Sequence, residues 1–119
     1  MQDFRNLLIW KKSINLCEQI YLVTKNFPKE ETYGLTNQIR RASISISSNI
    51  AEGCGRKTNK DFCNFLYIAS GSLKEIECQL IIAQKLNYIS LEILNKLIYE
   101  TIEIGKMISG FIKSLQNSG

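Results

Sequence analysis

The sequence has no histidine, a single proline and no pair of cysteines in C-x-x-C spacing. Structural zinc therefore has no plausible ligand set, and we expect neither a metal nor another cofactor. We interpret Cys17, Cys63 and Cys78 as residues of helix faces in a reducing cytosol. The chain has four cysteines: Cys17, Cys54, Cys63 and Cys78.

Long apolar runs are also missing, since none approaches the ~20 residues that cross a bilayer. The first residues, MQDFRNLLIWKKS, lack the basic segment, apolar core and cleavage site of a signal peptide. We expect a cytoplasmic protein without membrane contact.

The usual constellations of acid–base and nucleophilic catalysis are absent, so we expect no enzyme and no catalytic residue. Glu75 and Glu77 are two residues apart, on different faces of a helix, and do not form a carboxylate pair. We expect Glu52 to pair with Arg56, one helical turn further on.

What the chain does have is apolar residues at helical spacing, in four segments at about 7–26, 32–52, 59–87 and 90–116. Short turns join the segments, which predicts an all-α, antiparallel up-down-up-down four-helix bundle and one domain over residues 1–119. The clearest stripe keeps a heptad step through the third segment: Phe62, Leu66, Ala69, Leu73, Ile76, Leu80 and Ala83.

Several residues predict where the helices end. We expect Pro28 to end the first helix, and Gly53 and Gly55 to end the second. Thr58 or Asn59 can cap the third helix, and Ser90 the fourth. The alternating residues 43–47 also resemble a strand, but the helical periodicity on both sides favours a helix.

The second and third helices each have a second face that carries small and apolar residues in place of Lys and Glu. Such a face allows another helix to approach closely, so we predict a subunit interface there, although isolated apolar residues are common on any surface. The predicted interface residues are Ile44, Ser48, Ala51, Tyr67, Gly71 and Cys78.

The excess positive charge is concentrated in the same part of the chain. Residues 36–60 hold five basic residues and one acid, a difference equal to the net charge of +4 of the whole chain. Basic side chains bind phosphates, so this stretch predicts nucleic-acid binding, with Tyr67 as a candidate for base stacking. The predicted contacts are Arg40, Arg41, Arg56, Lys57 and Lys60.

Three motifs give the chain a family resemblance: F-P-x-x-E-x-Y-G-L-T-x-Q-I-R-R-A (27–42), S-N-I-A-E-G (48–53) and G-S-L-x-E-x-E-x-Q-L (71–80). With these motifs the chain resembles the 23S rRNA intervening-sequence proteins over residues 4–115. A proline expected between residues 42 and 47 is absent.

The resemblance implies a four-helix bundle that forms a homopentamer, encoded in bacterial genomes or within inserts in rRNA genes. The family is similar to accessory proteins of diversity-generating retroelements, which bind nucleic acid and a reverse transcriptase. Two functions follow as expectations. One is a non-enzymatic, oligomeric nucleic-acid-binding protein, with RNA as the first choice over DNA. The other is a pentameric scaffold that docks a nucleic-acid enzyme.

Overall fold

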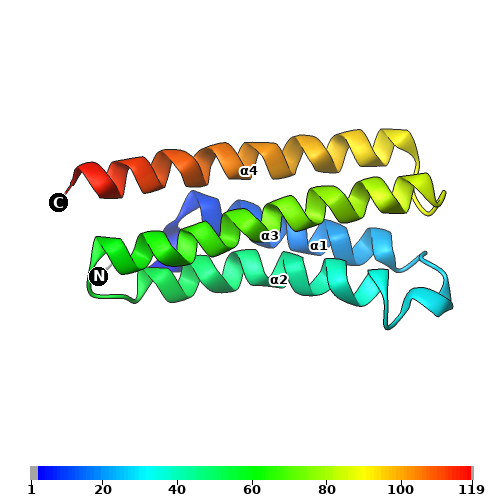
Figure 1. Ribbon diagram of the computed structural model, residues 1–119, viewed down its shortest axis with the longest axis horizontal. Coiled ribbons are helices and arrows are strands. Elements are labelled where there is room, and N and C mark those ends of the chain that lie inside the picture. Colours follow the sequence, from blue (N-terminus) through cyan, green and yellow to red (C-terminus); the bar gives the residue numbers. More distant parts are fainter. Residues whose placement is uncertain (1–2, 119) are drawn as a thin grey trace.

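In a computed structural model that describes residues 3–118, the chain forms four long α-helices. They are α1 (Leu8–Thr24), α2 (Leu35–Cys54), α3 (Asn59–Lys85) and α4 (Leu91–Asn117). Single 3-10 turns at Phe4–Asn6 and Lys29–Glu31 precede α1 and α2. Consecutive helices run in opposite directions along a body of 47 × 23 × 20 Å (Figure 1). The predicted all-α class is confirmed.

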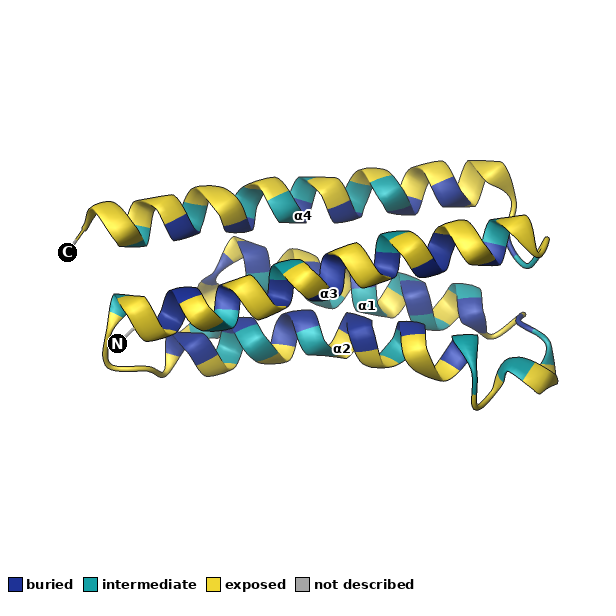
Figure 2. Ribbon diagram, in the orientation of Figure 1, coloured by how far each residue is buried: buried dark blue, intermediate teal, exposed yellow. Residues whose placement is uncertain are grey.

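The core lies along the axis between the helices, as the dark stripes of Figure 2 show. The heptad stripe predicted for α3, from Phe62 to Ala83, is buried at every one of its seven positions. Among neighbouring helices, packing is most extensive between α2 and α3 and least extensive between α1 and α4. The α2–α3 hairpin is therefore the centre of the fold.

α2 is helical through residues 43–47, so the alternative of a strand is wrong. Its serines have weak helix propensity, but the hydroxyls of Ser43, Ser45 and Ser47 are bonded within the bundle. Ser43 Oγ donates to the carbonyl of Arg40 (2.8 Å), and Ser72 Oγ of α3 donates to Ser45 Oγ (2.9 Å). Asn49 Nδ2 donates to both oxygens of Ser45, one helical turn earlier.

The residues that cap α3 and α4 are ones that the sequence predicted. Thr58 Oγ1 accepts from the backbone N–H of Asp61 (3.1 Å), and Ser90 Oγ accepts from that of Ile93 (3.1 Å). These caps confirm Thr58, in place of Asn59, and Ser90. Asn87, with a φ of 62°, lies beyond the end of α3, where a left-handed residue commonly ends a helix.

Of the residues predicted to end the first two helices, Gly55 is confirmed, and Pro28 and Gly53 are wrong. α1 ends at Thr24, four residues before Pro28, and Phe27 then turns into the core against the ring of Tyr88 (centroids 5.3 Å apart). Gly53 lies inside α2, where it is buried, and the helix continues to Cys54 with Gly55 as its cap. The reason is packing, since α3 passes close to the backbone of Gly53.

Candidate nucleic-acid interface

The charges of the bundle are distributed unevenly along its long axis. Cutting each helix at its middle puts residues 3–15, 45–71 and 105–118 in the half that contains the α2–α3 turn. This half, which we call the basic half, holds eight basic and three acidic residues. The other half holds seven basic and eight acidic residues, so the formal charges are +5 and −1.

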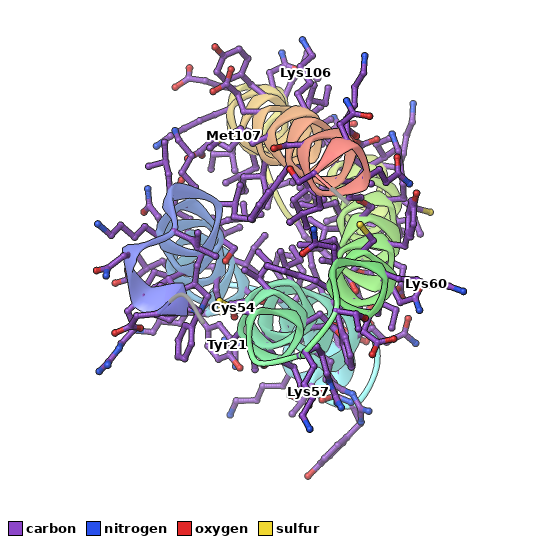
Figure 3. The ribbon with its side chains drawn as sticks, turned by 90° about the vertical axis from the view of Figure 1, so that its left-hand side faces the viewer. Tyr21, Cys54, Lys57, Lys60, Lys106 and Met107 are labelled. Carbon is purple, nitrogen blue, oxygen red and sulfur yellow. The ribbon has the colours of Figure 1, made fainter. Side chains whose placement is uncertain are left out.

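The positive charge of the basic half comes from α1, α3, α4, the turn between α2 and α3, and the turn before α1. Only part of it comes from the stretch that the sequence singled out, because α1 and α4 contribute four of the eight basic residues and the α2–α3 hairpin contributes three. Figure 3 looks onto this end, where the side chains of Lys57 and Lys60 point away from the bundle. The basic residues of this half are Arg5, Lys11, Lys12, Arg56, Lys57, Lys60, Lys106 and Lys113.

At the α2–α3 turn, Arg56 lies over the ring of Phe65, with its guanidinium carbon 4.7 Å from the ring centroid. Its Nη2 is 3.8 Å from Glu52 Oε2, which confirms the predicted pair. Both charged side chains are about half exposed, so this ion pair contributes little to stability. The contact with Phe65 holds the guanidinium against α3 while leaving it accessible.

Lys57 and Lys60 are exposed, and neither makes an ion pair with any residue of the described chain. Lys57 belongs to the turn and Lys60 to the first turn of α3. The positive end of the α3 dipole lies at the same place and adds to the attraction for anions. These two ammonium groups and Arg56 form the exposed part of the predicted basic stretch at this end of the bundle.

Arg5 is less available to a ligand. Its Nε and Nη2 donate to the two carboxylate oxygens of Asp3, at 3.0 and 2.8 Å. These bonds lower the pKa of Asp3 below its ordinary value, because they stabilise the ionised form. The Asp3 carboxylate thus stays charged at neutral pH and offsets part of the positive charge beside it.

Arg40 and Arg41 are separated from this turn by the length of half a helix. The 13 residues from Arg41 to Cys54 correspond to about 20 Å of helix. Arg40 is half-buried and faces α1, where its Nε donates to Thr24 Oγ1 (2.8 Å) and its guanidinium lies 4.5 Å from the centre of the Tyr21 ring. The five basic residues predicted from the sequence are therefore not one patch.

Arg41 is exposed and lines a groove between α2 and α3. Inside this groove the Gln79 side chain is buried, and its Oε1 has no hydrogen-bond partner among the described residues. The groove lies in the half with a charge of −1. Arg41 and Lys57 therefore belong to different surfaces of the molecule.

The residues predicted for a subunit interface lie on the outside of α2 and α3. Ile44, Ser48, Tyr67, Gly71 and Cys78 are exposed. Ala51 is half-buried. A Cβ on Gly71 would meet no atom within 4 Å, so nothing inside the subunit requires a glycine there.

Two further apolar side chains widen this surface. Ile68 and Ile82 of α3 are 52% and 42% exposed, and Ile44 of α2 is 43% exposed. The prediction missed Ile68 because the outward face was placed on a helical wheel about half a turn from the core stripe. Ile68 lies closer to α2, beside that face.

A hollow of about 370 Å³ opens on the other side of α3, between its first turns and the end of α4. Tyr67, which the sequence suggested both for the subunit interface and for base stacking, lines this hollow, and its hydroxyl accepts a hydrogen bond from Gln116 Nε2 of α4 (3.1 Å). Sequence reasoning did not find the hollow, because its two walls are some 50 residues apart in the chain.

Among residues 3–118, no set of three or more cysteine or acidic side chains is arranged to hold a metal ion. None of the helices in this range has both the length and the hydropathy needed to cross a bilayer. Burial raises the pKa of the Cys54 thiol, which makes this cysteine a poor nucleophile at neutral pH.

The fold and this charged end define the class of the protein: a small all-α bundle with one basic end and an outer face that carries exposed apolar side chains. The chain belongs to the family of the 23S rRNA-intervening sequence protein, whose family model matches residues 5–110. The resemblance found in the sequence is confirmed.

A solved structure from Bacteroides thetaiotaomicron is similar in fold, with a TM-score of 0.81 and 27% sequence identity. The similarity covers 89% of this chain and 99% of that one. That structure is described as a protein of unknown function from the S23 ribosomal protein family. Among curated proteins, none matches this chain significantly.

Proposed function

We propose that this protein is a non-enzymatic, oligomeric nucleic-acid-binding protein of the rRNA intervening-sequence type, and that it contacts RNA through the basic half. The observation that carries the proposal is the charge difference between the two halves, +5 against −1. A polyanion is attracted to one end of such a molecule and not to the other.

The contacts are assigned to Arg56, Lys57 and Lys60. Their side chains are exposed at the tip of the α2–α3 hairpin, and Lys57 and Lys60 have no acidic partner in the described chain. Lys and Arg that neutralise phosphates release counterions, which makes affinity fall with salt. Arg40 is left out of the assignment, because its guanidinium is already bonded to α1.

Assembly through the outer face of α2 and α3 is the second part of the proposal, with a homopentamer as the expected form. Exposed Ile44, Ile68 and Ile82 and the open backbone at Gly71 support it. Repeating the basic end around a ring would join several weak phosphate contacts into one strong interaction.

The experiment measures RNA and DNA binding by the purified oligomer across a salt series. In one variant Arg56, Lys57 and Lys60 are changed to Gln. In a matched control Lys25, Lys29 and Lys85, which are exposed at the opposite end, are changed to Gln. Both variants lose three positive charges, so a general effect of net charge would appear in both.

We expect the triple change at the basic end to weaken binding and to reduce the slope of log K against log salt by about 2–3 per contacting subunit. The control should keep the slope of the wild type. Equal effects of the two variants would contradict the assignment to the basic end. If the wild type binds neither RNA nor DNA at low salt, the proposal of a nucleic-acid-binding function is wrong.

In that last case a protein-interaction scaffold becomes the better function, with a nucleic-acid enzyme such as a reverse transcriptase as partner. One observation favours it. Arg56 lies on Phe65, one helical turn from the exposed Ile68. Arginine and aromatic side chains beside exposed apolar surface are enriched at protein interfaces. The acidic surface of a partner would then take the place of RNA phosphates.

A further inference from the structure

The hollow between α3 and α4 has the dimensions of a small ligand site and opens in the basic half. Its volume of about 370 Å³ is at the lower end of the range for small-molecule pockets. The lining residues are Asn59, Lys60, Cys63, Asn64, Tyr67, Leu115 and Gln116.

The walls combine an aromatic ring with amide groups. Tyr67 is 53% exposed, and the hydrogen bond from Gln116 Nε2 to its hydroxyl holds the phenol in place. The remaining amide N–H and the carbonyl oxygen of Gln116 are left to pair with a ligand. The Asn64 amide is exposed and makes no hydrogen bond to the described chain. Each amide offers both a donor and an acceptor.

The two helices that form the walls are joined at the base of the hollow. Asn59 Nδ2 donates to the carbonyl of Leu115 (3.2 Å), across the seam between α3 and α4. The Cys63 thiol is buried and faces the carbonyl of Ile112 (3.9 Å). The hollow is therefore pre-formed, and a ligand need not open it.

We propose that this hollow binds one unpaired nucleobase of a single-stranded nucleic acid. The base stacks on Tyr67, and Asn64 and Gln116 bond to its edge. Lys60, in the first turn of α3, contacts the adjoining phosphate. Stacking on an aromatic ring and amide contacts to exposed base edges are the means by which proteins recognise unpaired nucleotides. This assignment rests on the proposed function and adds a preference for single strands.

The test compares three ligands of equal length: a single-stranded RNA, an RNA duplex, and an abasic ribose-phosphate strand that has the same charge but no bases. The variant is Tyr67→Leu. Its matched control is Tyr99→Leu, which removes a tyrosine that is 65% exposed on α4 in the other half. A third variant, Tyr67→Phe, keeps the ring and loses only the bond to Gln116.

We expect the wild type to bind the single strand about 5- to 150-fold more tightly than the abasic strand, the range for stacking one base on an aromatic side chain. Tyr67→Leu should remove that difference without changing the salt slope, whereas Tyr67→Phe and Tyr99→Leu should keep it. Light scattering of each variant checks that the assembly is unchanged.

Equal binding of the single strand and the abasic strand by the wild type would overturn the base site. If that binding still depends on salt, the phosphate-binding function stands without it. Failure to bind any of the three ligands would contradict both the base site and the proposed nucleic-acid-binding function. An effect of Tyr99→Leu equal to that of Tyr67→Leu would also contradict the assignment to this hollow.

Discussion

Gly53 of α2 lies so close to Phe62 of α3 that a Cβ on residue 53 would be 2.8 Å from Cδ1 of that ring. The Cβ of Phe65 would be 2.9 Å away on the same side. No real side chain tolerates such distances, so the absence of a side chain at Gly53 sets how closely the two central helices pack.

Gly53→Ala should therefore lower the free energy of unfolding by about 1–3 kcal/mol, the usual cost of overpacking a core. Helix propensity alone would raise it by up to ~1 kcal/mol, since alanine replaces a glycine inside a helix. The two effects have opposite signs, and the net change, measured by urea denaturation followed by circular dichroism, shows which one is larger.

Gly110→Ala is the matched control, because a Cβ there meets nothing within 4 Å. This variant should be more stable than the wild type by up to ~1 kcal/mol. If Gly53→Ala is also stabilising, the close approach of Phe62 is not a constraint on the fold.

Arg40 should act in folding rather than in nucleic-acid binding. Arg40→Ala removes the bond to Thr24 and the stacking on Tyr21, and should cost about 1–2 kcal/mol of unfolding free energy. The salt slope of RNA binding should not change. Arg41→Ala, at the exposed neighbouring position, should alter stability by no more than ~0.5 kcal/mol. A reduced salt slope for Arg40→Ala would show that Arg40 does contact the nucleic acid.

Gly71→Arg should break the assembly while leaving a folded helical monomer. The position is exposed and open in the subunit, so an arginine fits there, but it would block a second helix from approaching. Light scattering measures the mass and circular dichroism the helicity. Gly110→Arg introduces the same side chain on α4 and should leave the mass unchanged. An unchanged mass for Gly71→Arg would refute this interface.

From the hydrogen bond of Tyr88 we predict that the protein loses stability at high pH. Its hydroxyl donates to Glu31 Oε2 (2.8 Å), and this bond, together with partial desolvation and the negative charge of Glu31, raises the pKa of Tyr88 above its ordinary value of 10.0. A raised pKa in the folded state means that the contribution to stability is complete below pH 10 and is lost as the pH rises through the folded-state pKa.

The measurement is the unfolding free energy of the wild type and Tyr88→Phe between pH 8 and 11, a range that spans the ordinary tyrosine pKa near 10. Tyr88→Phe should be less stable at pH 8 and should lose less stability above pH 10. Tyr99→Phe, at an exposed tyrosine, should follow the wild type. Parallel curves for the wild type and Tyr88→Phe would show that the bond to Glu31 has no effect on folding.

The fold was predictable because its signals are local. Every residue from Phe62 to Ala83 that the heptad step assigned to the core is buried, and Thr58 and Ser90 cap the helices that follow them. These patterns depend only on spacing within one helix. They are visible in the sequence without knowledge of which helices are neighbours.

Gly53 shows where local reasoning ends. A glycine after a run of helical residues commonly ends a helix, and the same residue inside a helix allows another to pack closely. The sequence near residue 53 does not distinguish the two uses, because the deciding contact is with Phe62 on a different helix.

The basic half was predicted only in part, for a similar reason. Arg56, Lys57 and Lys60 are close in sequence, but Lys11 and Lys113 join them only when α1 and α4 are placed in the bundle. Conversely, Arg40 is near the others in the sequence and faces a different helix. Charge counted along a chain and charge counted along a molecule are different quantities.

The unequal charges at the two ends of a body 47 Å long give the molecule a permanent electric dipole along its helices. In the field of a polyanion such a dipole experiences a torque before any atoms touch, so the molecule turns its basic end toward the partner during diffusion. Productive encounters then no longer depend on random orientation. Added salt would act twice, by weakening the contacts and by weakening this alignment.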